Sequence, residues 1–317
     1  MKWLQRQANP YRWTGDWSQL LDGDLAYSFG RSPATVVAAG VTLIFFIAAV
    51  FAPWVAPHDP FDIATLDLND AFLPPVWQGE TGSWTYPLGT DGQGRDVLST
   101  IVYATRISLT VGVLAVLLAA VLGGGLGLLA GYVGGWFDAL VMRLADIQLT
   151  IPAILAALMI DGIARLVLPA GDQDVLAIYV LILAIGISEW PGYARVIRGV
   201  VMAESGKDYV SAARVIGIHP VSIMLRHILP NVMGPMLVLA SIGLALAIIA
   251  EATLSFLGVG VPPTTPSLGT LIRVGDDFLF SGEWWILLFP AFALVALVLA
   301  VNVLGDWMRD ALDPKLR

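Results

Sequence analysis

The chain of 317 residues contains no cysteine, so disulfide bonds and metal sites built from thiolates are excluded. Only three histidines are present and no His-Glu-x-x-His pattern occurs, which argues against a zinc protease site. Charged residues make up 13% of the chain, compared with about 25% in soluble domains. The net charge is −8 and Lys and Arg form no dense cluster, so nucleic-acid binding is not expected.

The sequence also lacks a phosphate-binding loop. Gly206-Lys207 is the only Gly-Lys pair, Asp208 follows it in place of Ser or Thr, and no glycine stands five positions before Gly206. We therefore predict that the chain is not an enzyme and binds no cofactor of its own. Any hydrolysis of ATP must then come from a partner.

Long apolar runs are abundant. Hydrophobic residues account for 57% of the chain, and several runs reach the roughly 20 residues that a helix needs to cross a bilayer. We predict an all-α membrane protein with six transmembrane helices. About 34 mostly polar residues precede the first run, too many for a cleaved signal peptide, so this run is interpreted as a retained anchor. The six runs are Thr35–Val55, Ile107–Gly131, Leu149–Leu168, Val175–Ile187, Val232–Leu257 and Ile286–Gly305.

The distribution of Lys and Arg predicts which side of the membrane each segment occupies. With a cytoplasmic N-terminus and six alternating spans, only Arg95, Arg106, Arg165 and Arg273 are external, and the other 13 of the 17 basic residues are cytoplasmic. Apolar residues at helical spacing after Asp96 predict a helix that lies on the external surface of the membrane and runs into the second span. The predicted organisation is cytoplasmic 1–34, anchor 35–55, external 56–106, transmembrane core 107–305 and cytoplasmic tail 306–317.

Three glycines in the second run predict close helix packing. Gly123, Gly127 and Gly131 recur every four residues, and small residues at this spacing let two helix backbones approach each other. We interpret them as a packing face rather than a hinge.

Glu251 lies within the fifth run, where an unpaired carboxylate costs a few kcal/mol. Three interpretations are open. Glu251 faces a water-filled pathway, as a candidate translocation residue, or forms a hydrogen bond with a neighbouring helix, or reaches the external interface of the membrane.

The segment 193–231 is predicted to be a long cytoplasmic loop between two spans. Ser205 begins a helix capping box, and apolar residues then recur along one face of the helix that follows. This face consists of Tyr209, Ala212, Ala213 and Ile216.

A second short helix is predicted to follow in the same loop. Gly217 suits the left-handed position after a helix end, Pro220 suits the first turn of a helix, and Pro230 is expected to end it. Each helix has fewer than about 12 residues and is too short to be stable alone in water. The apolar face therefore packs either on this chain's own spans or in a groove of another protein.

This loop resembles the Glu-Ala-Ala loop of permease subunits of bacterial ABC importers, which reads Glu-Ala-Ala, three residues, Gly and a terminal Leu-Pro. Ser211 stands where the family has Glu, so the contact made by that carboxylate is not expected here. The matching positions are Ala212, Ala213, Gly217, Leu229 and Pro230.

The resemblance extends over most of the chain. LGTDGQGRDVLS, GYVGGWFDALVMRLADI, EATLSFLGVGVPPTTPSLGTLI and NVLGDWMRDALDPKLR occur in the order found in the dipeptide and oligopeptide permease family. The resemblance implies a type I importer permease in the bacterial inner membrane, with an anchor helix, a five-helix core and cytoplasmic coupling helices.

The resemblance also implies partners. These are a second permease subunit, two ATPase subunits that bind ATP and Mg²⁺, and an external binding protein that delivers a di- or oligopeptide. The residues implied to couple to the ATPases are Tyr209, Ala212, Ala213, Gly217, Leu229 and Pro230. The alternatives are a self-sufficient secondary transporter or channel, a permease for another substrate such as a nickel chelate, and an intramembrane enzyme.

Overall fold

A computed structural model describes residues 29–312, except 63–65, 79–81, 170–172 and 263. Most of the predicted cytoplasmic segment 1–34 lies outside the described residues. The described chain is helical and contains no strand, only an isolated bridge between Thr90 and Asp96. The longer helices are α3 (Pro33–Val50), α5 (Val97–Val133), α6 (Gly135–Leu149), α7 (Ala153–Val167), α8 (Gln173–Ser205), α11 (Leu229–Phe256) and α13 (Trp285–Leu312).

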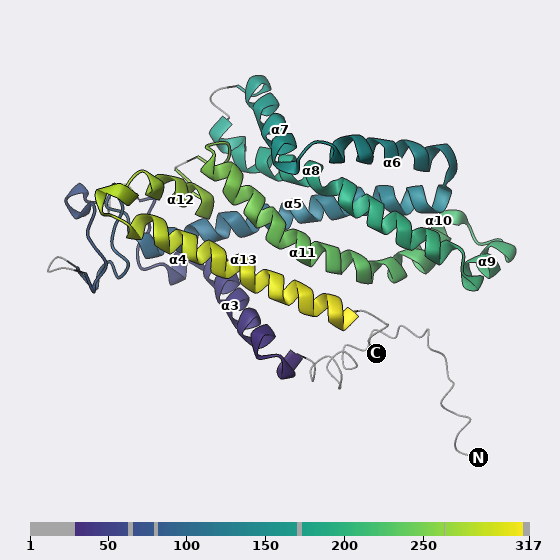
Figure 1. The fold of residues 1–317 in the computed structure, drawn as a ribbon, viewed down its shortest axis with the longest axis horizontal. Helices are drawn as coiled ribbons and strands as arrows, with labels where there is room; N and C mark the ends of the chain where they lie inside the picture. Colours follow the sequence, from purple (N-terminus) through teal and green to yellow (C-terminus); the bar gives the residue numbers. More distant parts are fainter. Residues whose placement is uncertain (1–28, 63–65, 79–81, 170–172, 263, 313–317) are drawn as a thin grey trace, which may run out of the picture.

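The shorter elements lie at the two ends of an elongated bundle (Figure 1). We call the end that carries segment 56–96 and α12 the cap end, and the end that carries α9 and α10 the hairpin end. α5, α8 and α11 run along the bundle, α13 runs from the cap end towards the hairpin end, and α3 packs against α5 and α13. The short helices are α4 (Ala52–Val55), α9 (Asp208–Val215), α10 (Pro220–Ile223) and α12 (Leu268–Asp276), with single turns at Leu68–Asp70 (η1), Met224–Ile228 (η2) and Leu279–Ser281 (η3).

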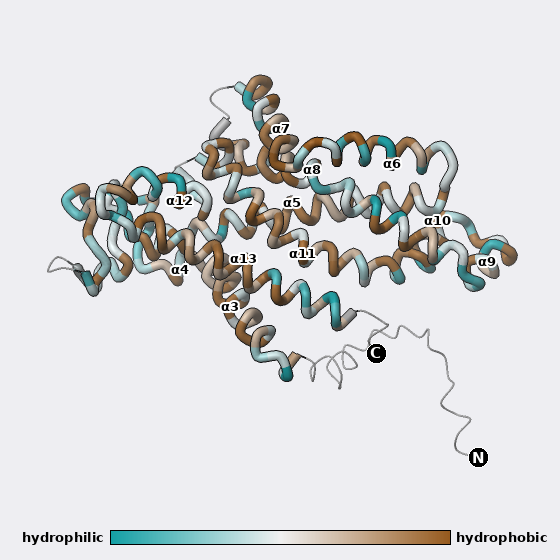
Figure 2. The backbone as a smooth tube through the Cα atoms, in the orientation of Figure 1, coloured by the Kyte–Doolittle hydropathy of each residue, from teal (hydrophilic) through white to brown (hydrophobic). Residues whose placement is uncertain are grey.

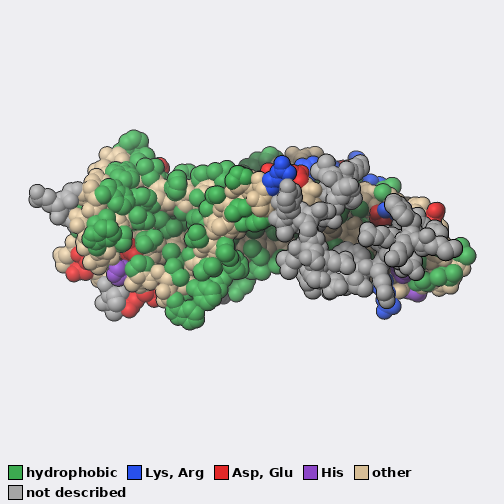
Figure 3. Space-filling view, turned by 90° about the horizontal axis from the view of Figure 1, so that it is seen from below, with side chains coloured by type: hydrophobic (Ala, Val, Ile, Leu, Met, Phe, Trp, Pro, Cys, Tyr) green, Lys and Arg blue, Asp and Glu red, His purple; other side chains and the backbone are tan. Residues whose placement is uncertain are grey.

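Apolar residues dominate the middle of the long helices and polar residues gather at the two ends (Figure 2). Green apolar side chains also cover much of the described surface in the space-filling view (Figure 3). Among the described residues, five helices are long and apolar enough to cross a membrane, or six if the bent pair α6 and α7 is one span. The prediction of a six-span all-α membrane protein is confirmed.

The third predicted span, Leu149–Leu168, is wrong as a single straight helix. α6 and α7 meet at an angle of 93° across a short break at Thr150–Pro152. Pro152 occupies the N-cap of α7, where its missing N–H costs no helical hydrogen bond. The predicted span begins at Leu149, so it did not include α6. Two carboxylates of α6 pair with α8 in the structure: Asp138 with Arg198, and Asp146 with Arg195.

The fourth predicted span ends too early, because α8 continues past Ile187 to Ser205. Pro191 lies inside this helix and cannot donate the hydrogen bond that the Ile187 carbonyl would otherwise receive. The side chain of Gln148, on α6, donates to that carbonyl instead. Gln148 is itself held by the indole N–H of Trp190, at 2.8 Å. The proline is therefore tolerated because a neighbouring helix supplies its missing donor.

α5 is one unbroken helix of 37 residues, so the helix predicted after Asp96 does run into the second span. Asp96 caps its N-terminus by accepting from the backbone N–H groups of Leu98 and Ser99. Val97 and Ile101 in its first turns are buried in the hydrophobic core with α11, α12 and α13. Packing against these helices, rather than against lipid, fixes this part of the chain.

The glycine repeat of α5 faces α8, as predicted. A β-carbon on Gly123 or Gly127 would lie within 2.5 Å of the backbone carbonyl oxygen of Trp190 or Ala194, and one on Gly131 would lie 2.8 Å from that of Arg198. Larger side chains would force the two backbones apart. The interpretation of these glycines as a packing face is confirmed.

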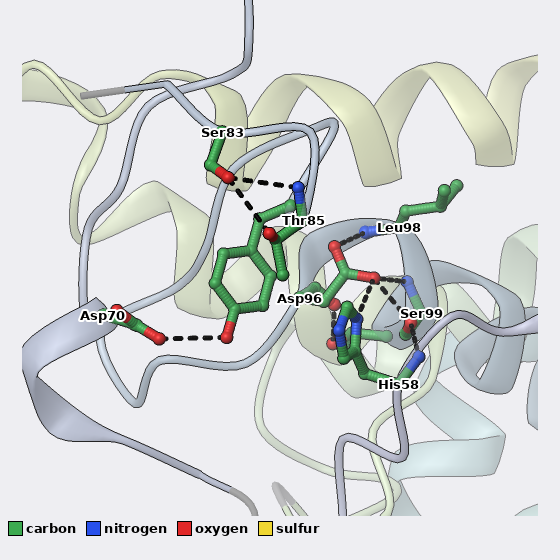
Figure 4. A network of polar contacts seen from close by, with 9 residues as sticks. His58, Asp70, Ser83, Thr85, Asp96, Leu98 and Ser99 are labelled. Atoms are coloured by element: carbon green, nitrogen blue, oxygen red, sulfur yellow. Dashed lines mark hydrogen bonds and ion pairs between the residues drawn. The ribbon is translucent and has the colours of Figure 1, made fainter. Parts of the chain in front are cut away.

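Segment 56–96 forms the cap over the N-terminus of α5 (Figure 4). The backbone N–H of His58 donates to the Ser99 hydroxyl at 3.0 Å, and its ring lies 3.6 Å from the buried carboxylate of Asp96. The Tyr86 hydroxyl donates to Asp70 at 3.0 Å. Burial and this hydrogen bond to a carboxylate raise the pKa of Tyr86. These contacts tie an irregular segment to the helix that it precedes.

The last helix is longer than predicted. α13 was expected to end at Gly305, with a cytoplasmic tail from residue 306, but it continues to Leu312. Residues 313–317 lie outside the described part of the chain. The helix runs from the cap end towards the hairpin end, which brings its C-terminal turns to the same side of the molecule as α9 (Figure 1).

Candidate functional site

The hairpin of α9 and α10 is the most exposed structured feature at its end of the bundle. α8 ends at Ser205, and α9 begins after Lys207, which is its N-cap and makes no side-chain capping bond. The capping box predicted from Ser205 is therefore wrong, because Ser205 is still part of α8. Asp208 in the first turn of α9 and Arg214 in the last have the signs that the helix dipole favours.

Gly217 closes α9 in the predicted left-handed conformation, with φ of +79°. The N–H of Ile218 donates to the Ala213 carbonyl at 3.0 Å, and the N–H of Gly217 donates to the Arg214 carbonyl at 3.1 Å. These two bonds form a Schellman motif, in which a residue without a β-carbon is strongly favoured. The reversal of the chain between α9 and α10 therefore depends on Gly217.

One face of α9 packs on this chain's own helices. Val210 and Ala213 are buried in a cluster that includes Ile197 of α8 and Ile228 near the start of α11. Tyr209 packs against the same cluster. The interpretation that the predicted apolar face binds the chain's own spans is thus correct for this part of it.

A polar clasp around the Tyr209 hydroxyl joins three helices. This hydroxyl donates to Glu204 at the end of α8, at 2.8 Å, and accepts from the Asn231 side-chain amide of α11 at 3.2 Å. The same amide donates to the backbone carbonyl of His227 at 2.8 Å. The sequence placed Tyr209 on an apolar face whose packing partner stayed open, and it did not indicate Glu204 or Asn231. Only the structure shows that these three side chains meet.

The opposite face of α9 carries an exposed apolar tip. Val215 is 86% exposed and Ile216 is 73% exposed, and Ser211 and Ala212 are exposed beside them. The predicted face of four residues is therefore divided. Tyr209 and Ala213 are four residues apart and face the bundle, whereas Ala212 and Ile216 lie about 100° around the helix and face outward. We call Ser211, Ala212, Val215 and Ile216 the tip.

Pro230 was predicted to end the second helix, but the helix continues through it. α10, a π-helical turn at η2 and α11 follow each other without a break, and Pro230 lies in the first turn of α11. The wide turn closes with the N–H of Leu229 donating to the Met224 carbonyl. A proline after such a turn removes no bond that the helix still needs. Leu229 packs in the same cluster as α9 and so joins the hairpin to α11.

Glu251 is completely buried in the described chain and forms hydrogen bonds within the protein, while its role as a translocation residue stays a prediction. Its carboxylate accepts from the hydroxyls of Ser108 on α5 and Ser255 on α11, both at 2.7 Å, and from Ser267. Ser108 in turn accepts from the backbone N–H of Leu268, at the start of α12, at 3.2 Å. Glu251 is thus the centre of a hydrogen-bond network that joins three helices.

No cluster of three or more His, Cys, Asp or Glu side chains that could hold a metal ion occurs among the described residues. The hairpin combines a packed inner face, a polar clasp and an exposed tip, so its geometry suits a mechanical connection between helices.

Comparison with known proteins identifies the family. Residues 123–317 match the binding-protein-dependent transport system inner membrane component, and residues 23–75 match the N-terminal transmembrane domain of oligopeptide transport permease C. The first match spans the hairpin and all the helices from the middle of α5 onward. The chain belongs to this family of permeases.

Curated relatives match the permease over almost its whole length. It is 42% identical to the dipeptide transport system permease protein DppC of Escherichia coli, over 91% of both chains. It is 38% identical to the protein of that name in Haemophilus influenzae, over 92% of this chain and 94% of the relative. It is also 38% identical to the di/tripeptide transport system permease protein DppC of Pseudomonas aeruginosa, over 92% and 91%.

Family and fold together give the setting of the hairpin. The permease is a multi-pass inner-membrane component of a transport system that works with a binding protein and further subunits. A self-sufficient secondary transporter or channel, and an intramembrane enzyme, do not fit this family. The resemblance stated from the hairpin and the four further sequence motifs is confirmed.

Proposed function

We propose that this permease moves di- or oligopeptides from an external binding protein into the cytoplasm, as one of two permease subunits driven by two ATPase subunits. The names of its relatives, which are dipeptide and di/tripeptide permeases, support the peptide substrate. The observation that carries the proposal is the tip. An apolar surface with Val215 and Ile216 exposed, on a hairpin rigidly joined to two long helices, suits the helix-in-groove mode of binding.

The hairpin end is cytoplasmic in this proposal, with both termini on the same side. The charge distribution supports this orientation, because Arg195, Arg198 and Arg214 lie on α8 and α9 near the hairpin and Lys207 lies between these helices. Arg273, one of the few basic residues predicted to be external, lies on α12 at the opposite end of the bundle.

Motion of the ATPase subunit reaches the transmembrane helices through the contacts that hold α9. The tip occupies the groove of an ATPase subunit, and the inner face of α9 stays packed on α8 and α11. Because Tyr209 joins Glu204 of α8 to Asn231 of α11, a displacement of α9 pulls on both helices together. Each of them runs the length of the bundle, so the motion reaches the cap end. Ala212 contacts the partner directly, whereas Ala213, Gly217, Leu229 and Pro230 hold the hairpin in shape.

ATP and Mg²⁺ are bound by the ATPase subunits and not by the permease in this proposal. The absence of a phosphate-binding loop in the sequence supports this division. The purified permease should neither bind nor hydrolyse ATP in equilibrium dialysis and phosphate-release assays. Specific binding of ATP by the partner-free protein would contradict this part of the proposal.

The main test combines copurification with uptake. Ile216→Asp places a charge on the tip without touching the chain's own core, so we expect it to abolish copurification of the tagged ATPase and uptake of a radiolabelled dipeptide. Phe280→Asp is the matched control for copurification, because Phe280 is 96% exposed but lies in η3 at the cap end. If uptake that depends on this gene were found for a nickel chelate and not for the dipeptide, the proposed peptide substrate would be wrong.

A further inference from the structure

A cavity of about 350 Å³ lies at the cap end, between α7, α12 and the turn that follows α11. Its volume falls within the range of about 300–1,000 Å³ typical of small-molecule sites. The side chains and backbone that matter for its chemistry are Arg165, Gly258, Gly260, Arg273 and Asp277. It is separate from the hairpin, which lies at the other end of the bundle (Figure 1).

Two guanidinium groups line this cavity, and each has a defined position. Arg165 pairs with the buried carboxylate of Asp161 at 2.6 Å and reaches the Gly260 carbonyl at 3.5 Å. The Arg273 guanidinium lies against the turn at Gly258, where a β-carbon would approach its Cζ to 2.7 Å. Gly258 has φ of +82° and closes α11 in a Schellman motif. The turn thus leaves room for the guanidinium beside it.

A carboxylate faces the same space. Asp277 follows Arg273 by four residues along α12 and its C-cap, so both side chains lie on one side of the helix. Both residues are exposed, and none of the ion pairs between described residues includes either of them. The cavity therefore offers a cationic and an anionic group that the protein itself does not neutralise.

We propose that this cavity binds a short zwitterionic peptide, with the C-terminal carboxylate at Arg273 and Arg165 and the N-terminal ammonium at Asp277. Guanidinium groups bind carboxylates through paired, charge-assisted hydrogen bonds. Val261, Pro262 and Val274 supply apolar wall for a side chain. An acidic loop of the binding protein would be attracted by the two arginines but repelled by the Asp277 carboxylate. The charges in the cavity therefore favour a small ligand that carries both a carboxylate and an ammonium group. The choice of a peptide rests on the proposed function.

The test measures binding of three ligands to the purified full-length permease in lipid nanodiscs. The ligands are the dipeptide Ala-Phe, its C-terminal amide and its N-acetyl derivative. We expect the wild-type permease to bind Ala-Phe at least tenfold more tightly than the amide. We also expect Arg273→Gln to weaken Ala-Phe binding at least tenfold and to remove the preference for the acid over the amide.

Asp277→Asn examines the other end of the ligand. It should weaken Ala-Phe severalfold and leave binding of the N-acetyl derivative unchanged, because that ligand has no ammonium group. Arg143→Gln is the matched control, since Arg143 is exposed on α6 and does not line the cavity. The comparison of ligands on the wild-type permease needs no variant, so a misfolded variant would not prevent the test.

Three results would overturn the proposal. These are the absence of dipeptide binding by the wild-type permease, equal binding of acid and amide, and an unchanged preference in Arg273→Gln. Loss of binding-protein docking in Arg273→Gln, without dipeptide binding by the wild type, would make the cavity a protein contact instead. Uptake by a strain in which the gene is deleted distinguishes failure of the cavity assignment from failure of the proposed function. If uptake is lost but no dipeptide binds, only the cavity assignment fails; if uptake persists, the proposed function fails.

Discussion

Gly217 is the residue on which the shape of the hairpin depends most directly. Its φ of +79° lies in the left-handed region, and open space surrounds the position at which a β-carbon would lie. A residue with a β-carbon pays about 1–2 kcal/mol for this conformation, and asparagine pays less than most. Two substitutions of Gly217 can therefore separate the effect of backbone strain from the effect of side-chain bulk.

We expect Gly217→Trp to abolish dipeptide uptake and ATPase copurification while membrane insertion stays near normal. The indole adds both strain and bulk next to the tip, whereas the spans are held by their own apolar surface. Gly217→Asn should retain most of both activities, and Ser211→Ala should change little, because the usual glutamate is already absent there. Wild-type uptake and copurification in Gly217→Trp would mean that the hairpin is only a structural connector.

Glu251 provides the second test at this scale. Glu251→Gln keeps the volume and one acceptor for the hydroxyls of Ser108 and Ser255, so we expect normal transport and a small change in thermal stability. Glu251→Leu leaves the hydroxyls without an acceptor and should lower the free energy of unfolding by about 1–3 kcal/mol. A stable Glu251→Gln variant that cannot transport would support a direct role of the Glu251 carboxylate in the translocation pathway.

At the scale of whole elements, the contact between α5 and α8 organises the bundle. Three glycines on α5 bring its backbone against that of α8, and Gln148 of α6 completes the hydrogen bonds of α8 around Pro191. In a membrane, where apolar surface gives little drive for association, such close approach is a main source of helix–helix stability.

We expect Gly127→Leu to disrupt this contact, because even a β-carbon there would meet the Ala194 carbonyl. Overpacking costs typically about 1–3 kcal/mol when side chains can adjust, and more is expected against a backbone. Gly125→Leu is the matched control, since Gly125 lies on the same helix, is exposed and has nothing within 4 Å of its β-carbon position. Thermal aggregation and size-exclusion profiles in detergent should separate the two variants. Equal behaviour would show that α5 and α8 tolerate separation.

The whole molecule has two chemically different ends. Segment 56–96 and α12 form one, and the α9–α10 hairpin forms the other, with long apolar helices between them (Figure 2). We therefore expect the two ends to lie on opposite sides of the membrane, so that one measurement of sidedness fixes both.

We expect the hairpin end to be cytoplasmic, and the natural absence of cysteine allows a direct test. Single cysteines at Leu68 and Asp277 should react with a membrane-impermeant thiol reagent in intact cells. A cysteine at His219 should react only after the inner membrane is permeabilised. Labelling of the His219 position and protection of Asp277 in intact cells would reverse the orientation.

Local and compositional features were readable from the sequence alone. These include the membrane class, the helix after Asp96, the packing face of the α5 glycines and the left-handed turn at Gly217. Each depends on neighbours along the chain, or on a spacing that a helix converts into one face, so no knowledge of distant contacts was needed. The five sequence motifs indicated the permease family.

Tertiary structure alone decided features that depend on partners distant in sequence. α8 continues through Pro191 because Gln148 replaces the missing donor, and Glu251 is buried because Ser108 and Ser267 satisfy it. α9 is divided between a packed face and a tip because α8 and α11 meet only one side of it. Burial and hydrogen-bond satisfaction are properties of what surrounds a residue, and those surroundings come together only when the helices pack.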